Sequence, residues 1–426
     1  MLNLIRLLGL FLASCLIYPF KKELAVYNFL KVAGPPFIKL GQVLSVRPDL
    51  VGTKIATTLS SFQDRLQPCS NKRLQKILQE EFRNFSDIFA DFDFNSVASA
   101  SIAQVHKAKL KDGRVVAVKI LRPQIEKIMA RDISSLKILI KFLAFFSKFL
   151  AKSFSDIVDL LSDLSRSELD LIHEAANASR LKEELKEVKG FYVPEIFWKY
   201  SSSKILVLEW IDGIAFSNKA EIAATNFDKK QIAQNLVISY FTQVYSNGFF
   251  HADMHPGNLF LMKNGDIGVV DFGIMGKIDK KTRLAVAEIL IGFLHKDYQR
   301  VAQLHIDAGL VPPLTKVDDL AISCRKIGEM IVGSDVRDIS VAKLLSDLII
   351  MTRQYQMETR GEILLLQKTL LLVEGVGVTL DPELNIWDLA RPWVKEWAKK
   401  NISFDAKIRD TMVELFELAR KFLRSI

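Results

Sequence analysis

The sequence predicts an α+β protein that combines a small β-rich lobe and a large helical lobe with an N-terminal helical extension. β-rich runs occupy residues 101–110 and 114–121, and the turn signal Lys111-Asp112-Gly113 separates them as in a hairpin. Residues 1–95 and nearly everything after Lys280 have helical periodicity instead. With 49% hydrophobic and 25% charged residues, the composition is that of a globular protein, which excludes disordered and collagen-like chains.

Length, cysteine content and charge indicate the number of folding units, the compartment and the kind of partner. The 426 residues are enough for two or three folding units of roughly 150 residues each. Cys15, Cys69 and Cys324 are widely spaced, so they predict neither a disulfide framework nor a metal site, and they indicate a reducing compartment. The formal net charge of +9 favours an anionic partner such as a nucleotide or a membrane surface. This charge is spread out and no basic–aromatic motif occurs, so we expect no nucleic-acid binding.

The first element is an apolar run at residues 7–20, which follows Arg6. It is shorter than the roughly 20 residues that a membrane-spanning helix needs, and no small-residue cleavage pattern follows it. We interpret residues 1–33 as a membrane-associating helical segment; a core helix of the folded protein is the alternative. Residues 34–95 are expected to form a further helical extension, interrupted by a loop from Gly34 to Asp49.

The β-rich lobe is expected at residues 96–213. Helical periodicity at residues 124–165 predicts an insertion into this lobe. Two more strands are expected at residues 193–198 and 204–210, and Asp212-Gly213 closes the second of them.

The helical lobe is expected at residues 214–382. It includes a helix at residues 229–246 and a hairpin at residues 259–270, whose turn is Asn264-Gly265. Residues 383–426 are interpreted as an amphipathic tail.

The clearest chemical signal is the segment His251-Ala252-Asp253-Met254-His255-Pro256-Gly257-Asn258, which the hairpin separates from Asp271-Phe272-Gly273. This pattern, H-x-D-x-x-x-x-N followed by strand, turn, strand and D-F-G, is typical of the catalytic centre of a protein-kinase-like fold. Phosphoryl transfer needs a group that accepts the proton of the attacking hydroxyl, and Asp253 suits that role. It also needs oxygen ligands for Mg²⁺, which Asn258 and Asp271 are expected to supply.

A zinc site is the competing interpretation of the same segment, because His251 and His255 have the spacing of a pair on one face of a helix. Pro256 and Gly257 break the helix that such a pair requires. The sequence therefore favours phosphoryl-transfer chemistry over zinc binding.

The nucleotide-binding signals lie upstream. Val116-Ala117-Val118-Lys119 on an expected strand predicts that Lys119 contacts the α- and β-phosphates of a nucleotide. A glycine-rich phosphate loop should precede it, but alanine stands at each of the three glycine positions. A Cβ atom there restricts both the backbone angles and the approach to phosphate, so we expect a stiff loop and slow phosphoryl transfer. The loop residues expected at the nucleotide are Ala98, Ser99, Ala100, Ser101, Ile102, Ala103 and Gln104.

Taken together with Phe37-Ile38-Lys39-Leu40-Gly41-Gln42 and Glu168-Leu169-Asp170, these motifs resemble those of the UbiB family, atypical protein-kinase-like proteins of ubiquinone biosynthesis. The resemblance extends from about Gly34 to Asp381-Pro382. It implies that Lys39 and Gln42 belong to a K-x-G-Q element in an extension that folds over the nucleotide cleft. It also implies that Glu168 and Asp170 form an E-x-D element that engages this extension, which gives all four residues a regulatory role.

The resemblance further implies that Glu174, in the segment Glu174-Ala175-Ala176-Asn177, is the helix-C glutamate that pairs with Lys119. The interval between the two residues is long, and the helical insertion accounts for it. On pattern alone, Glu168, Asp170 and Glu174 are more typical of the solvated face of a helix than of a functional site.

Two departures from related proteins bear on function. No A-P-E triplet follows Gly273, and a helix is expected within about ten residues, which leaves little room to dock a peptide substrate. The resemblance also implies a C-terminal pair of hydrophobic membrane helices, whereas here Trp387, Trp393 and Trp397 alternate with lysines in an amphipathic pattern. Membrane attachment must then rest on residues 7–20, on residues 136–152 or on this tail.

The sequence therefore predicts an atypical kinase or ATPase that binds ATP and Mg²⁺ at the cytoplasmic face of the inner membrane and supports ubiquinone synthesis. Val207–Ile211, which includes Glu209, is expected to be the hinge that seats adenine by its backbone. The expected partners are a nucleotide, the lipid surface, and ubiquinone-biosynthesis enzymes or quinone precursors. A non-catalytic, nucleotide-dependent scaffold or lipid-presenting module remains the alternative, because the same Asp253, Asn258, Asp271 and Lys119 set is compatible with it.

Overall fold

The structure is a computed structural model of the chain. It describes residues 2–45, 51–59, 68–82, 84–146, 168–332 and 361–401, together with single positions between 152 and 162 and at 351, 354 and 355. The chain divides into two compact units. The first unit comprises Met1–Lys182, Pro194–Ile211 and Asp271–Gly273, and the second comprises Glu183–Val193, Asp212–Val270 and Ile274–Ile426.

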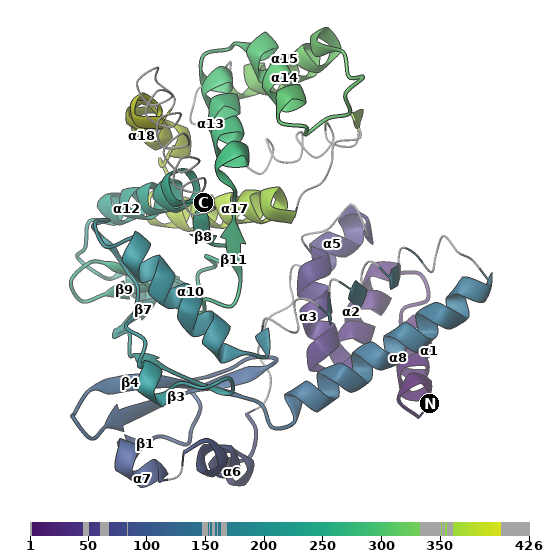
Figure 1. Cartoon of the computed structure of the whole chain (residues 1–426), viewed down its shortest axis with the longest axis vertical. Coiled ribbons are helices and arrows are strands. Elements are labelled where there is room, and N and C mark those ends of the chain that lie inside the picture. Colours follow the sequence, from purple (N-terminus) through teal and green to yellow (C-terminus); the bar gives the residue numbers. More distant parts are fainter. Residues whose placement is uncertain are drawn as a thin grey trace, which may run out of the picture. The chain divides into compact units, whose positions relative to one another are not determined.

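The first unit contains an antiparallel five-stranded sheet in the order β1-β3-β4-β6, with β2 paired to β3. Figure 1 labels β1, β3 and β4 of this sheet. The strands are β1 (Phe89–Phe92), β2 (Ala98–Ser99), β3 (Ala103–Leu110), β4 (Val115–Leu121) and β6 (Ile205–Glu209). The β3–β4 hairpin turns at Gly113, whose φ of 91° is a left-handed angle that glycine adopts readily. The strands predicted at residues 101–110, 114–121 and 204–210 are confirmed. The helical prediction for residues 34–95 is wrong at residues 89–92, which form β1, because Phe89 and Phe92 are buried in the sheet lobe beside β3.

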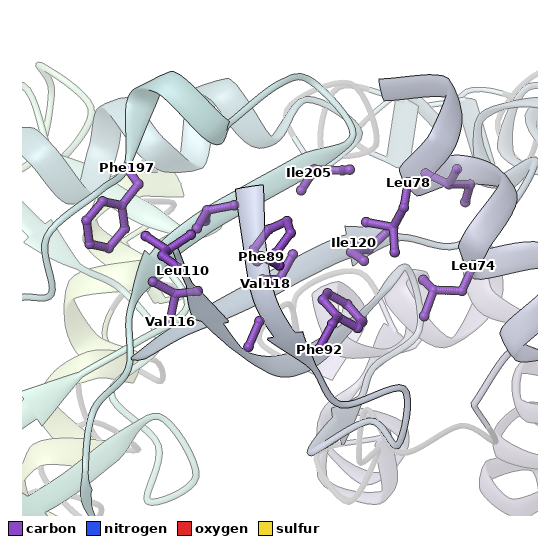
Figure 2. Close-up of a cluster of buried hydrophobic side chains, with 13 residues drawn as sticks. Leu74, Leu78, Phe89, Phe92, Leu110, Val116, Val118, Ile120, Phe197 and Ile205 are labelled. Carbon is purple, nitrogen blue, oxygen red and sulfur yellow. The ribbon is translucent and has the colours of Figure 1, made fainter. Parts of the chain in front are cut away.

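One face of this sheet packs on helix α6 (Asn71–Glu81) to form a hydrophobic core (Figure 2). Successive residues of a strand face opposite sides of the sheet, so Val116, Val118 and Ile120 of β4 are all fully buried in this core. The same alternation directs Lys119, which lies between two of them, to the other face of the sheet. The cluster also contains Leu74, Ile77, Leu78, Phe89, Phe92, Ala108, Leu110, Phe197, Ile205 and Val207.

The N-terminal part of the first unit is a helical cluster. Its helices are α1 (Leu2–Ile17), α2 (Lys22–Ala33), α3 (Pro35–Ser45), α5 (Thr53–Leu59) and α8 (Ile125–Phe146). They share a core formed by Leu7, Leu30, Ala33, Phe37, Leu40, Leu44, Leu59 and Leu161. The described part of the insertion predicted at residues 124–165 is thus helical, as expected, and its helix α8 contributes to the packing of the extension.

The loop predicted from Gly34 to Asp49 is wrong for residues 35–45, which form α3. Pro35 and Pro36 lie in the first turn of this helix, where the missing N–H is not needed and the fixed φ of proline suits the helix. The two prolines therefore begin a helix instead of breaking one. Residues 46–49 of the predicted loop lie outside the described residues.

The second unit contains a four-stranded sheet in the order β5-β10-β9-β7 and a separate pair of strands, β8 and β11. The bounds are β5 (Phe191–Tyr192), β7 (Gly213–Ala215), β8 (Phe249–His251), β9 (Leu259–Met262), β10 (Ile267–Val269) and β11 (Met275–Lys277). The hairpin predicted at residues 259–270 is confirmed, and its turn has Gly265 at a φ of 86°.

Helices make up most of the second unit (Figure 1). Helix α12 packs against both α17 and α18, and α14 packs against α13 and α15. Several of these helices begin at aspartates whose carboxylates accept a backbone N–H, namely Asp228, Asp279 and Asp297. The bounds are α11 (Lys219–Ala223), α12 (Lys229–Phe241), the π-helix η2 (Thr242–Asn247), α13 (Lys280–Leu294), α14 (Tyr298–Asp307), α15 (Val317–Val332), α17 (Gly361–Leu380) and α18 (Ile386–Asn401).

The strand predicted at residues 193–198 is wrong. Strand β5 ends at Tyr192, Ile196 forms only an isolated bridge with Leu208, and a 3₁₀ turn, η1 (Trp198–Tyr200), follows. Pro194 explains the interruption, because proline has no N–H to donate to a sheet ladder.

Among the described residues, α17 is long and apolar enough to cross a membrane by length and composition alone. Its most apolar window has a mean hydropathy of 1.7, and 33% of that window is buried within the protein. Core helices of soluble proteins have the same composition, so this pattern is weak evidence of a span. In the predicted tail, residues 402–426 lie outside the described residues.

Candidate active site

In the first unit, Lys119 is held between two carboxylates. Its Nζ donates hydrogen bonds of 2.8 Å to both oxygens of Glu174 and another of 2.8 Å to Asp271 Oδ1. Lys119 comes from β4 and Glu174 from the first turn of α10 (Leu171–Glu184). The Lys119 and Glu174 side chains are 16% and 7% exposed, whereas that of Asp271 is 48% exposed. The structure thus brings together three of the predicted site residues.

Lys119, Glu174 and Asp271 are here called the Lys119 triad, and the charges within it shift the pKa values of Lys119 and Glu174. Burial by itself lowers the pKa of Lys119, but attraction to Asp271 and Glu174 outweighs burial and raises it. Burial raises the pKa of Glu174, an effect that Lys119 opposes and repulsion from Asp271 reinforces. Lys119 is therefore a fixed positive charge at neutral pH, as a group that binds phosphate must be.

Asp271 has a φ of 66°, in the left-handed region that residues with a Cβ atom rarely adopt. The turn that follows is held in place by α10, because Asn177 Nδ2 donates a 3.0 Å hydrogen bond to the carbonyl oxygen of Phe272. The Phe272 side chain is fully buried. Such backbone strain, maintained by its surroundings, is concentrated at functional positions.

The alanine-rich loop, residues 98–104, is braced by Arg122. The guanidinium donates from Nε to the carbonyl oxygen of Ala100 at 2.9 Å and from Nη2 to Ser99 Oγ at 2.8 Å. The backbone N–H of Arg122 also donates to the carbonyl oxygen of Ile102 at 2.7 Å. Ala98, Ala100 and Ala103 all have φ outside the left-handed region, so this loop conformation does not require glycine.

The end of the loop is anchored by a buried hydrogen-bond chain. Gln104 Oε1 accepts from the N–H and the thiol of Cys69 at 3.0 and 2.9 Å, and Gln104 Nε2 lies 2.7 Å from His106 Nε2. His106 Nδ1 lies 2.9 Å from the carbonyl oxygen of Asp93. Burial lowers the pKa of His106, so the imidazole is neutral and accepts the Gln104 amide hydrogen. Ser101, Ile102 and Ala103 are also buried, so most of the loop is packed.

Glu209, at the end of β6, interacts with Glu195. Its backbone N–H donates to the Glu195 carbonyl oxygen at 2.8 Å, and its Oε2 accepts from the Glu195 N–H at 3.1 Å. These bonds fix the expected hinge segment after β6. The role of Glu209 toward adenine stays a prediction.

In the second unit, residues 251–258, here called the HxD loop, follow strand β8. Asn258 Nδ2 donates to the carbonyl oxygen of Asp253 at 3.1 Å, which closes the loop on itself. The carbonyl oxygen of Asn258 accepts from the N–H of Val270, the residue that precedes Asp271 in the chain. The hairpin β9–β10 therefore fixes the end of the HxD loop.

Both histidines of the HxD loop serve to hold it. His251 is fully buried, and its Nδ1 accepts from the N–H of Asp253 at 3.2 Å while its Nε2 lies 3.2 Å from the carbonyl oxygen of Val270. His255 Nδ1 accepts from the N–H of Gly257 at 2.9 Å. Within the described ranges, no group of three or more His, Cys, Asp or Glu side chains lies close enough to hold a metal ion.

Asp253 forms an ion pair that its sequence neighbours do not supply. Lys368 Nζ, from α17, lies 2.7 Å from Asp253 Oδ1, and the two side chains are 28% and 22% exposed. Burial raises the pKa of Asp253, but Lys368 and the nearby histidines outweigh burial and hold it below the ordinary value. Asp253 is therefore ionised at neutral pH and can accept a proton.

Mg²⁺ prefers oxygen ligands and in nucleotide sites is held by one or two protein groups together with the phosphates. Asp271 offers a half-exposed carboxylate. The Asn258 amide nitrogen is directed to the Asp253 carbonyl, which leaves its Oδ1 as the ligand atom. Each residue therefore offers an oxygen of the kind that Mg²⁺ takes as a ligand, and their joint role in a nucleotide-associated site stays a prediction.

The predicted regulatory residues also lie in the first unit. Lys39, on α3, forms an ion pair with Glu168, and both side chains are buried to about nine-tenths. Gln42 lies three residues further along α3 and is half-buried. Asp170 Oδ1 accepts from the N–H of Ile172 at 3.0 Å, so it caps the start of α10, the helix that carries Glu174.

Sequence reasoning missed three contacts of this site. Arg122, Asn177 and Lys368 bind the loop, the D-F-G turn and Asp253, respectively. Asn177 lies in the motif Glu174-Ala175-Ala176-Asn177, but the motif does not predict its contact with Phe272. Arg122 follows the lysine strand by one residue, a position that could have drawn attention to it. Lys368 is 115 residues from Asp253 and carries no local signal.

Known proteins resemble this chain both in sequence and in fold. Residues 61–305, more than half of the chain, match the family model of the ABC1 atypical kinase-like domain, and residues 324–385 match that of the UbiB helical domain. The chain is 38% identical over 398 residues to a "Probable protein kinase UbiB" of Pseudomonas fluorescens strain Pf0-1, covering 90% of this chain and 73% of that one. A protein of the same name from Cellvibrio japonicus is 37% identical, with 86% and 67% covered.

Among solved structures, the complex of Rv3197 with erythromycin from Mycobacterium tuberculosis resembles this fold with a TM-score of 0.57 and 24% identity, covering 86% of this chain and 92% of that one. The predicted α+β, kinase-like fold class is thereby confirmed. The chain belongs to the UbiB family of atypical kinase-like proteins.

Proposed function

We propose that this chain binds Mg·ATP and acts as an atypical kinase or ATPase that supports ubiquinone biosynthesis at a membrane. The observation that carries the proposal is the Lys119 triad: a buried ammonium held by both oxygens of Glu174 and by Asp271 at 2.8 Å. In protein kinases a strand lysine, a helix glutamate and the D-F-G aspartate must all be in place for phosphoryl transfer.

Each residue has a chemical role in this proposal. Lys119 binds the α- and β-phosphates, and the backbone of Val207–Ile211 binds adenine. Asp253, which is ionised, accepts the proton of the attacking hydroxyl or water. Asn258 and Asp271 hold Mg²⁺, which neutralises negative charge on the phosphates when bound.

The braced alanine-rich loop favours a slow, restrained reaction. Two side-chain hydrogen bonds from Arg122 and the anchor at Gln104 limit its movement toward the phosphates. The buried Lys39–Glu168 ion pair supports a regulatory role for the extension. Gln42 lies on the same helix as Lys39, and Asp170 lies two residues after Glu168. Positioning supplies most of the catalysis in phosphoryl transfer, so restraint of this kind lowers the rate.

The acceptor is proposed to be a small molecule or water. Only six residues separate Gly273 from α13 at Lys280, and half of them form β11, paired with β8. The second unit also has a cavity of about 250 Å³ beside Pro256 of the HxD loop. Its walls are mainly apolar, and Lys219 and Lys229 also line it, which fits an apolar molecule with an anionic or phenolic group such as a quinone precursor.

Membrane association is proposed to occur through the N-terminal helices, at the cytoplasmic face of the inner membrane. One side of α1 packs into the helical cluster through Leu7, while large apolar side chains on its other side are exposed in the described structure. These exposed residues are Ile5, Leu8, Phe11, Leu12, Leu16 and Ile17, with Phe20 just beyond the helix. A helix with one apolar side exposed can bind the interfacial region of a bilayer.

The alternative of a non-catalytic scaffold is not favoured. The curated relatives bear the name of a probable protein kinase, and this chain carries the complete set of Lys119, Glu174, Asp253, Asn258 and Asp271. A scaffold needs no ionised carboxylate held in position by a lysine from a distant helix.

Nucleotide binding tests the proposal directly. We expect Asp271→Asn to abolish the Mg²⁺-dependent part of ATP binding, because it removes a full charge from a hard-cation site. Lys119→Ala should weaken ATP binding by about 1–3 kcal/mol, the range for a charged hydrogen bond. Calorimetric titration with ATP, with and without Mg²⁺, measures both effects, and Lys109→Ala, on an exposed position of β3, is the matched control. Unchanged affinity in both site variants would contradict the proposal.

A further inference from the structure

The positive charge next to Asp253 comes from the helical region that follows the kinase-like region. Lys368 lies in α17, within the residues that match the UbiB helical domain. Its Nζ donates to Asp253 Oδ1 at 2.7 Å, and each of the two side chains is less than one-third exposed. An ion pair sheltered to this degree is more strongly fixed than one on an open surface.

The position of Lys368 is determined by the packing of α17. Residues at helical spacing, among them Leu366, Thr369 and Val373, are buried against neighbours that include α12. Tyr240 of α12 donates a 3.1 Å hydrogen bond to the carbonyl oxygen of Leu366, two residues before Lys368. The helix therefore cannot rotate or slide without breaking buried contacts, and Lys368 stays beside Asp253.

The two carboxylate oxygens of Asp253 have different surroundings. Oδ1 accepts from Lys368, whereas Oδ2 lies 3.8 Å from His255 Nε2, beyond hydrogen-bond distance. The His251 ring is engaged with backbone groups of Asp253 and Val270. The contact with Lys368 therefore holds Oδ1 in place and leaves Oδ2 as the oxygen that can accept a proton.

We propose that Lys368 is a positioning residue of phosphoryl transfer, which holds Asp253 through Oδ1 so that Oδ2 meets the attacking hydroxyl or water. This inference rests on the proposed function. In the step concerned, the attacking oxygen forms a bond to the γ-phosphorus and gives its proton to Asp253 Oδ2. The bond between the γ-phosphorus and the bridging oxygen breaks, ADP leaves with that electron pair, and Asp253 later releases the proton to water.

The helical region has a structural role at the HxD loop through Lys368. Helix α17, residues 361–380, supplies Lys368, the partner of Asp253 in the ion pair at the HxD loop. A displacement of about 1 Å at a reacting group is enough to reduce a rate by about 100-fold, so loss of this support should act on the chemical step.

The kinetic test compares ATP hydrolysis by the full chain carrying Lys368→Met, Lys368→Arg or Gln367→Met, the last being a neighbouring change on the same helix. We expect Lys368→Met to lower kcat by about 10- to 100-fold with little change in KM for ATP, because the group it supports acts in the chemical step. Lys368→Arg should recover most of kcat, since arginine can donate to the same oxygen. Gln367→Met should match the wild type.

A second measurement separates positioning from general destabilisation. In an Asp253→Asn background, Lys368→Met should cause no further loss of turnover, because residues that act as a unit are not additive. Hydrogen exchange of the HxD-loop amides should be faster in Lys368→Met and normal in Lys368→Arg.

The outcomes are distinct. If the wild type hydrolyses ATP and Lys368→Met does so equally well, the role of Lys368 is overturned and the proposed function stands. If Lys368→Met lowers turnover by the same factor in the Asp253→Asn background, or if Lys368→Arg recovers nothing, Lys368 acts by some other means and the inference is also overturned. If the wild type does not hydrolyse ATP or phosphorylate any acceptor, the proposed function and this inference both fail.

Discussion

Replacing Lys119 by methionine should destabilise the first unit by leaving a buried charge unpaired. Glu174 is 7% exposed, and both its oxygens accept hydrogen bonds of 2.8 Å from Lys119. Removing one partner of a buried ion pair costs about 3–5 kcal/mol, because the remaining charge keeps its desolvation penalty and loses its compensation. Asp271, at 48% exposure, is largely solvated, so its part of the interaction should add about 0–1 kcal/mol.

Hydrogen exchange of the β4 amides is the appropriate assay, because it reads the free energy of opening in the unit that contains the triad. We expect faster exchange in Lys119→Met, equivalent to about 3–5 kcal/mol. The double variant Lys119→Met, Glu174→Gln should recover a large part of this loss, since a neutral amide is cheaper to bury than a carboxylate. Lys109→Met, at an exposed position of β3, should stay within about 0.5 kcal/mol of the wild type.

Two results would refute this reasoning. Wild-type exchange in Lys119→Met would mean that Glu174 does not depend on Lys119 for charge compensation. A double variant that opens as easily as Lys119→Met would mean that the loss comes from packing and not from the unpaired carboxylate.

Three further predictions concern the loop, pH and the membrane. Ala100→Gly should tighten ATP binding by letting the backbone approach the phosphates, and a calorimetric titration that gives equal or weaker affinity would contradict this. Burial lowers the pKa of His106 below its ordinary value of 6.5, so below pH 6.5 the unfolded chain binds more protons than the folded chain and the free energy of unfolding falls as the pH falls. His106→Gln should flatten this part of a curve of unfolding free energy against pH. An unchanged slope would exclude His106 as its cause. Deleting residues 1–20 should release much of the protein from anionic lipid vesicles in a flotation assay, and high salt should release some of the intact protein; retention after both treatments would point to another attachment.

Features encoded by short stretches of sequence were predictable. The β3–β4 hairpin follows from alternating residues around Lys111-Asp112-Gly113, and the HxD loop follows from its spacing to Asp271. Helix α3 was not predicted, because Pro35 and Pro36 begin a helix as readily as they end one and only the packing of Phe37 into the helical cluster decides between these outcomes.

Contacts between distant parts of the chain were not predictable in the same way. The pairing of Lys119 with Glu174 was expected only through the family resemblance, since 55 residues separate them. Arg122 and Lys368 escaped notice because an arginine after a strand and a lysine in an apolar helix have no distinctive spacing. Their roles depend on where β4 and α17 pack, which periodicity alone does not specify.

Phosphate release from ATP labelled at the γ-position, measured for the purified wild type and Asp253→Asn with Mg²⁺, tests the central claim most directly. The account predicts that the wild type releases phosphate or transfers it to an acceptor, that Asp253→Asn loses nearly all of this activity and keeps only a residual rate, and that both bind Mg·ATP with similar affinity, because Asp253 acts on the attacking oxygen. Equal release by the two proteins, or none by the wild type despite ATP binding, would contradict it.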